Sequence, residues 1–292
     1  MTRYKLTFKP HSDYSKIHIS GELNGKVFIY RYMPFSVFIK CLCTKTFRFN
    51  EPSQWPDQFE SRFYNATYFS PKNHVIPHKV FAFCTTAERD CEASWSIYAS
   101  NEPTIQIKIN RSKWLSSLNK WNKDKKNSKF TIYESKVNYD LKEAHIAVIH
   151  KPNFVDRYNI LQKTQGHDLL FKNFDLDSYL SLLLLKRMAY SYEDEIRYMI
   201  VQQHKEEIDS KDEKYLDLPI FDFDFIEEIR FSSRLSLCQL CKILTIFEGN
   251  GWVQQQTGIK KVILKKDNKE IPLYAFDISE GTYADMSKPI TI

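Results

Sequence analysis

The chain has 292 residues, of which 15% are aromatic and only seven are glycine. This length predicts one or two domains with a sizeable buried core. The formal charge of +6, from 42 basic and 36 acidic side chains, is mild for the size. Neither G-x-G-x-x-G nor G-x-x-x-x-G-K-S/T occurs, which excludes a glycine-rich phosphate loop of either common kind.

The N-terminus and the cysteines indicate a cytoplasmic protein with reduced thiols. The first residues, Met-Thr-Arg-Tyr-Lys-Leu, lack the apolar segment of a signal peptide, and the longest apolar run, 180–185, is too short to span a bilayer. The six cysteines are therefore expected to stay unpaired. Cys238 and Cys241 have the spacing of a metal-ligand pair, but no second Cys/His pair matches it. We interpret them as core thiols.

The first half of the chain predicts strands that end in polar residues. Residues 1–26 predict a strand or a leader, and a short buried strand at 27–31 ends in Arg31. A charge placed there requires a partner, and the planar guanidinium suits either a phosphate or a carboxylate. A second buried strand, 79–86, runs into the hydroxyl groups of Thr85 and Thr86.

A helix follows from about Glu88 and carries Trp95 and Tyr98 at helical spacing, a pattern more typical of a core than of a site. Three isoleucines at alternate positions then predict a half-buried strand at 105–109.

Two oppositely charged blocks come next. Residues 111–129 hold seven Lys/Arg against one Asp, with Trp114, Leu118 and Trp121 along one side of a predicted amphipathic helix. Such a block can contact nucleic acid, although most basic runs are solvated faces. Residues 205–228 hold three Lys against ten acidic residues and predict a loop.

The remaining pattern predicts an α+β fold of mixed, largely antiparallel sheets with flanking helices. The elements expected after the basic block are strands at 130–134 and 145–150, a helix at 154–172, a helix that Asp177 caps, strands from 196 and at 226–231, a helix at 235–247 and a hairpin turning at 267–268. We expect a single catalytic-like domain at 27–276 and a tail at 277–292.

The strongest candidate for chemistry is a pair of carboxylates, Glu193 and Glu195, followed by Arg197. If a strand begins near Glu193, its period of two places these three side chains on one face. Two carboxylates that close repel each other, so one should hold its proton more readily than an isolated acid. Such a pair suits work on a sugar. The alternative is a solvated strand start with an Arg partner.

An ordered set of short motifs covers roughly residues 27–275. The set comprises Tyr30-Arg31-Tyr32, Asn50…Pro52…Asp57…Phe59-Glu60, Phe83-Cys84-Thr85, Trp95…Tyr98-Ala99, Lys186 and Tyr192-Glu193-x-Glu195-x-Arg197. It resembles a widespread bacterial domain-of-unknown-function family, DUF family 2971. The chain departs from that family's pattern at Ile97, where a His is usual, and at Thr85, where a Ser is usual. The Asn-Asp-Pro-Phe-Glu loop of the family is also spread out here.

The order of Arg, hydroxyl and Glu-x-Glu is also similar to the arginine–serine–glutamate class of ADP-ribosyltransferases. The resemblance implies NAD as substrate, with Arg31 on a phosphate, Thr85 or Thr86 at the nicotinamide ribose, and Trp95 or Tyr98 available to stack. It implies that Glu195 bonds the ribose 2′-hydroxyl and steadies the oxocarbenium-like state, while Glu193 helps to activate the acceptor. Low glycine content fits a class that binds NAD without a Rossmann turn.

By analogy, such an enzyme would be a toxin or phage-defence effector. Its acceptor stays open: an unknown macromolecule (a protein or a nucleic acid), a small molecule, or water, as in an NAD glycohydrolase. The analogy allows for an inhibitory or activating protein partner, and no metal or membrane is expected.

Other function classes remain open on the sequence alone. A metal-dependent nuclease would use Glu195 and Arg197 as a degenerate acid-x-Lys element. A non-catalytic binding or sensor module would keep the paired glutamates as structural groups. Cys84 as a nucleophile and His74 with His78 as ligands are weaker alternatives, because Cys84 ends an apolar strand and Pro77 interrupts any regular helix between the histidines.

Overall fold

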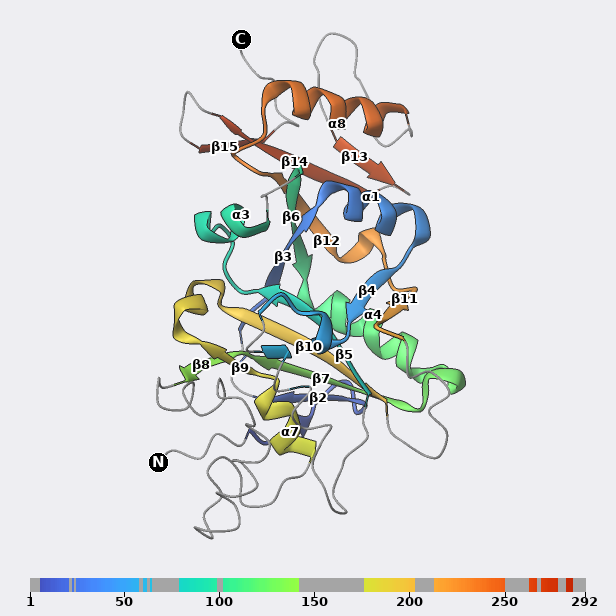
Figure 1. Cartoon of the computed structure of the whole chain (residues 1–292). Coiled ribbons are helices and arrows are strands. Elements are labelled where there is room, and N and C mark those ends of the chain that lie inside the picture. Colours follow the sequence, from blue (N-terminus) through green and yellow to red (C-terminus); the bar gives the residue numbers. More distant parts are fainter. Residues whose placement is uncertain are drawn as a thin grey trace. The chain divides into compact units, whose positions relative to one another are not determined.

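The structure of the protein, a computed structural model, describes residues 6–20, 23, 25–57, 60–61, 64, 79–98, 102–141, 176–202, 213–249, 263–266, 269–277 and 282–285. Figure 1 labels its helices and strands. Contacts divide the chain into two compact units. The first unit comprises Met1–Asn24, Arg48–Cys84 and Asn119–Leu218. The second comprises Gly25–Phe47, Thr85–Leu118 and Pro219–Ile292. Both units draw on three separate stretches of chain, and the domain boundaries after residues 26 and 276 stay a prediction.

The first unit is built mainly from strands. Its elements are β1 (Lys9–Pro10), β2 (Ile17–Ser20), most of β4 (Phe47–Asn50), the 3₁₀ turn η1 (Pro52–Gln54), most of β5 (Lys79–Thr86), the end of α4 (Arg111–Lys123), η2 (Lys125–Asn127), β7 (Phe130–Lys136), β8 (Asn138–Leu141), α7 (Leu176–Leu182), β9 (Leu185–Arg187), η3 (Met188–Glu193), β10 (Glu195–Gln202) and β11 (Tyr215–Leu218). The strand order is β1-β2-β7-β10-β5, and β4 joins β5 to β11. The short strands β8 and β9 pair in parallel as a separate sheet.

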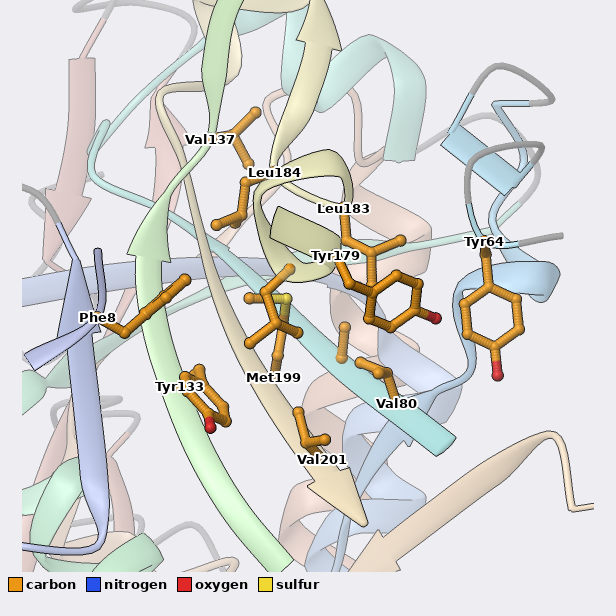
Figure 2. Packing of buried hydrophobic residues seen from close by; sticks show 12 residues of the cluster. Phe8, Tyr64, Val80, Tyr133, Val137, Tyr179, Leu183, Leu184, Met199 and Val201 are labelled. Carbon is orange, nitrogen blue, oxygen red and sulfur yellow. The ribbon is translucent and has the colours of Figure 1, made fainter. Parts of the chain in front are cut away.

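The centre of this unit is β10, which is antiparallel to β7 and buried at every position except its last. From Tyr198 to Val201 its sequence is apolar on both faces, because both faces are covered. Figure 2 shows Met199 and Val201 among apolar side chains from neighbouring strands and from the α7 region. The rings of Phe8 and Tyr133 meet there edge to face, with centroids 5.1 Å apart. Fully burying each large apolar side chain contributes about 1.5–3 kcal/mol.

The second unit also combines a sheet with helices. Its elements are β3 (Phe28–Pro34), α1 (Phe35–Thr44), the end of β5, α3 (Glu92–Tyr98), β6 (Thr104–Asn110), most of α4, η4 (Phe223–Phe225), β12 (Ile226–Phe231), α8 (Leu237–Gly249), β13 (Ile263–Lys266), β14 (Lys269–Asp277) and β15 (Thr282–Asp285). Strand β6 lies antiparallel between β3 and β12. Strand β14 is parallel to β12 and antiparallel to β13 and β15.

The two faces of this second sheet differ in character. The strand pairing places Ile29, Ile107 and Ile229 on one side of β3, β6 and β12, and all three are fully buried. The other side carries the cross-strand row Tyr30, Lys108 and Glu228, whose last two members form an ion pair. Alternate residues of one strand therefore serve the core and a polar face.

The predicted fold class is confirmed, because the structure is α+β with a large, mostly antiparallel sheet and a few helices. The predicted hairpin is supported by the pairing of Lys266 with Lys269, although residues 267–268 lie outside the described residues. So do the predicted strand at 145–150, the predicted helix at 154–172, His74 and His78, and residues 205–212 of the acidic block. The described remainder of that block contradicts the predicted loop, because it contains β11, η4 and the start of β12. No helix among the described residues is long and apolar enough to cross a bilayer.

The interpretation of two cysteines as core thiols is also wrong. Cys238 and Cys241 were expected in the core, yet both thiols are exposed on α8. The apolar side chains on either side of them suggested burial. In the structure the buried face of α8 is instead formed by residues such as Ile243 and Phe247, which leaves the two cysteines on the solvent side.

Candidate functional site

Five charged side chains form a buried network in the first unit. They are Glu60, Lys186, Glu193, Glu195 and Arg197, with exposures of 5%, 7%, 8%, 4% and 1%. Charged groups this deeply buried must be paired, because the loss of hydration costs several kcal/mol per ion. We refer to these five residues as the charge network.

A backbone turn at Asp194 brings the side chains of Glu193 and Glu195 together. Glu193 ends η3 and Glu195 begins β10, while Asp194 between them is left-handed with φ of 37°. Asp tolerates this conformation better than most residues. Lys136 on β7 holds Asp194 through an ion pair of 2.8 Å between Nζ and Oδ1. The strand therefore begins two residues later than the spacing argument assumed, and a turn, rather than strand alternation, aligns the glutamates.

Lys186 on β9 links the carboxylates of the network. Its Nζ donates to Oε2 of Glu193 at 2.5 Å and to Oε2 of Glu195 at 3.0 Å. It also lies 3.8 Å from Oε2 of Glu60. One ammonium group thus faces three carboxylates from two separate parts of the chain, Glu60 and the Glu193–Glu195 segment.

Arg197 forms the other positive centre. Its Nε donates to Oε1 of Glu195 at 2.6 Å, and its Nη2 donates to Oε2 of the same carboxylate at 2.9 Å. The guanidinium also donates to Oε1 of Glu60 and to the carbonyl oxygen of Leu183. Its Cζ lies 4.2 Å from the centroid of the Trp55 ring, within cation–π range.

These surroundings push the carboxyl pKa values apart. Burial alone would raise the pKa of Glu195, but the charges of Arg197 and Lys186, with hydrogen bonds from Arg197 and Cys84, outweigh it and hold that pKa well below its usual range. Burial raises the pKa of Glu193 and of Glu60, and the negative charge of Glu195 adds to both shifts while the cations only partly oppose them.

The neighbouring carboxylates keep both cations charged. Burial would lower the pKa of Lys186, but Glu195, Glu60 and Glu193 hold it above its ordinary value. Arg197 likewise keeps a raised pKa, because Glu195 and Glu60 outweigh its burial. Lys186 is therefore an ion-pair partner and not a neutral amine nucleophile.

Half-buried aromatic residues border the charge network. The hydroxyl of Tyr139 on β8 accepts a hydrogen bond of 2.9 Å from the backbone N–H of Glu195. Arg187 donates to Oδ2 of Asp57 at 3.0 Å and to the hydroxyl of Tyr190 at 2.9 Å. With Trp55, these residues place ring surfaces beside acids, a combination that suits the apolar faces and hydroxyl groups of a sugar.

The arrangement favours proton transfer at Glu193. Three carboxylates face two cations, so the network would carry one net negative charge if all five groups were ionised. Glu193 combines a raised pKa with the largest exposure of the three acids. Within the described part of the chain, no three His, Cys, Asp or Glu residues are arranged to hold a metal ion.

The other predicted site residues belong to the second unit. Arg31 is on β3 and pairs with Ile107 of β6. Its side chain is on the sheet face opposite to that of Tyr30 and Tyr32. The pairing of Tyr30 with Thr86 implies that Thr85 shares the Arg31 face and that Thr86 lies on the other. Thr85 and Thr86 are both buried.

The two predicted stacking residues differ in what they offer. Trp95 is 1% exposed, meets Tyr32 edge to face at 4.7 Å and donates from Nε1 to Asp90. It is a core residue, as its helical spacing indicated. Tyr98 is 41% exposed and stacks on Tyr32 with ring centroids 5.8 Å apart. Because Tyr32 lies on the sheet face opposite Arg31, the structure does not group Arg31 with these rings.

The sequence reasoning assigned no role to Glu60, Lys186 and Trp55. Glu60 is 137 residues from Arg197, and no local pattern indicates a contact across that distance. The available signal was the ordered motif set, because it includes Glu60 and Lys186 together with the Glu193-x-Glu195-x-Arg197 segment.

Comparison with known protein families matches part of the chain. Residues 94–198 match a family described as a protein of unknown function (DUF2971). The matched stretch runs from α3 to Tyr198 and includes Lys186, Glu193, Glu195 and Arg197, which supports the family resemblance seen in the motifs. No curated protein and no solved structure matches the chain. The description of the family carries no activity.

Proposed function

We propose that this protein is an ADP-ribosyltransferase-like enzyme that cleaves the nicotinamide–ribose bond of NAD at the charge network. The observation that carries the proposal is that Glu193 and Glu195 share the ammonium group of Lys186, at 2.5 and 3.0 Å, while Arg197 bonds Glu195. This geometry displaces the two carboxyl pKa values in opposite directions, Glu193 upward and Glu195 downward. Pairs of acids whose environments separate their pKa values are typical of sites that divide an acid–base task.

The proposed step breaks one bond and forms another at the ribose C1′. The electrons of the C1′–N bond move to the nicotinamide nitrogen, and neutral nicotinamide leaves an oxocarbenium-like ribose. A site with excess negative charge stabilises that cation. The acceptor then adds to C1′, and its proton passes to Glu193, whose raised pKa suits a general base near neutral pH.

Glu195 takes a different role in this proposal from the one the resemblance implies. A carboxylate offers about four lone-pair positions, and those of Glu195 receive bonds from Arg197, Lys186 and Cys84. We therefore assign Glu195 as the positioning residue that fixes Lys186 and Arg197, and Glu193 as the residue that contacts the reacting groups. Arg31 and Thr85 share one strand face within the second unit, and their contacts with a phosphate and a ribose stay predictions of the resemblance.

The test measures nicotinamide released from NAD by the purified chain. The wild type is expected to release nicotinamide, and Glu193→Gln is expected to slow the release by about 10²-fold or more, the typical contribution of general acid–base catalysis. Glu102→Gln, at an exposed glutamate of the second unit, is the matched control. No release by the wild type with any acceptor tried, or equal rates for wild type and Glu193→Gln, would refute the proposal.

One observation favours a second candidate, a non-catalytic binding module. All five charged groups of the network already bond one another, as in a structural ion-pair cluster. In that case Glu193→Gln would change only stability. Isothermal titration of the wild type with NAD, followed by the release assay, separates the candidates, because a module binds without turnover.

A further inference from the structure

The structure divides the basic block at 111–129 into two parts with different surroundings. Lys113, at its start, is already engaged, since its Nζ donates to the carbonyl oxygen of Asp224 at 3.0 Å and lies 3.3 Å from Oε1 of Glu227. Five lysines at its end are exposed and belong to the first unit: Lys120, Lys123, Lys125, Lys126 and Lys129. We call these five residues the lysine surface.

The lysine surface has little internal compensation. Asp124 is the acidic residue among its positions, and it pairs with Lys126 at 3.5 Å in an ion pair of which both members are largely exposed. Within the described ranges, the other four lysines have no carboxylate in ion-pair distance. The helix dipole stabilises the positive charges of Lys120 and Lys123, which lie in the last turn of α4. Lys125 and Lys129 lie beyond the helix end and are not stabilised in this way.

The backbone beneath these lysines is fixed by side-chain contacts. The Asp124 carboxylate accepts from the N–H of Lys126 at 3.2 Å, and Asn127 donates from Nδ2 to the carbonyl oxygen of Trp121 at 2.9 Å. The rings of Trp121 and Phe130 pack with centroids 5.4 Å apart, which ties the end of α4 to the start of β7. The cations are therefore held on an ordered corner.

We propose that the lysine surface binds the phosphate backbone of double-stranded nucleic acid without reading its sequence. A duplex presents one charge per about 1.7 Å of axis, which allows closely spaced lysines to contact several phosphates at once. Two features favour this over other anionic partners. No large apolar side chain is exposed between 112 and 129 to enter a membrane or to form the apolar centre of a protein interface. Nor does this corner offer an exposed aromatic ring to stack on single-stranded bases.

The test titrates a fluorescent DNA duplex and an RNA duplex, each of about 20 bp, with the full-length chain at several salt concentrations. Contacts with three to five phosphates predict a slope of log K against log salt of about −2.7 to −4.5 for DNA. The triple variant Lys120→Gln, Lys123→Gln, Lys125→Gln removes three contacts, so its slope should be shallower by about 2.7.

A matched triple variant removes the same charge elsewhere. Lys26, Lys40 and Lys242 are exposed lysines of the second unit, and their replacement by Gln should leave the slope unchanged. Equal loss in both triple variants would show an effect of net charge alone and overturn the proposal. It would also be overturned if neither duplex binds at about 50 mM salt, or if phosphatidylserine vesicles or polyglutamate bind and the duplexes do not. The assay contains no NAD, so its outcome is independent of the proposed enzymatic function.

Discussion

Glu195 and Arg197 face each other two residues apart on β10, joined by hydrogen bonds of 2.6 and 2.9 Å between the guanidinium and both carboxylate oxygens. Both side chains are almost completely buried, so neither charge is hydrated and each depends on the other for compensation. An intact buried pair of this kind contributes little net stability, but removing one member leaves an uncompensated charge. That asymmetry makes the charge network open to test by single substitutions.

Arg197→Met should strongly destabilise the protein. The substitution keeps much of the side-chain volume but leaves Glu195 and Glu60 facing Lys186 alone, and breaking a buried pair typically costs about 3–5 kcal/mol. Urea denaturation at neutral pH measures the free energy of unfolding. Arg48→Met is the control, because Arg48 pairs with Asp217 at a partly exposed site and such pairs contribute about 0–1 kcal/mol. Similar losses in the two variants would contradict the buried network.

Lys186→Met should destabilise the protein in a pH-dependent way. Without the ammonium group, the pKa values of Glu193 and Glu60, already raised by burial, should rise further. A carboxyl whose pKa is higher in the folded than in the unfolded state lowers stability above its folded pKa, and the penalty is relieved as pH falls through that value. The loss relative to wild type should therefore be greater at pH 7 than at pH 5.

The double variant Lys186→Met, Glu193→Gln provides the internal check on that prediction. It removes one cation together with one carboxylate, so part of the stability at pH 7 should return. If the double variant is no more stable than Lys186→Met alone, Glu193 does not contact the ammonium in the manner described.

Asp194 should be sensitive to replacement through its backbone. A left-handed conformation costs roughly 1–2 kcal/mol for most residues but almost nothing for glycine. Asp194→Ala should therefore be less stable than Asp194→Gly, although both lose the ion pair with Lys136. Lys136→Met removes only the ion pair and isolates its share. Thermal unfolding of the three variants gives the comparison, and an alanine variant as stable as the glycine variant would argue against the turn.

Local patterns predicted the elements that carry the site, but not its composition. The strand from Ile196, the buried strand at 79–86 and the amphipathic helix over the basic block follow from apolar periodicity, and each is present as β10, β5 and α4. The proximity of Glu193 and Glu195 was also predicted, although for a reason that the turn at Asp194 replaces.

What local patterns missed depends on contacts between distant segments. Glu60 reaches Arg197, and the exposure of Cys238 and Cys241 depends on which face of α8 packs inward. Neither property is encoded in a window of neighbouring residues, because each is decided by packing against segments more than a hundred residues away or on another layer of the fold.

Titration of the glutamate carboxyl carbons by ¹³C NMR tests most directly whether the network separates its two neighbouring acids. One resonance, lost in Glu195→Gln, should titrate well below the ordinary range of a glutamate pKa, and another, lost in Glu193→Gln, should titrate above it. Both resonances titrating near the usual glutamate value would contradict the account, because the network would then impose no difference between the two carboxyl groups.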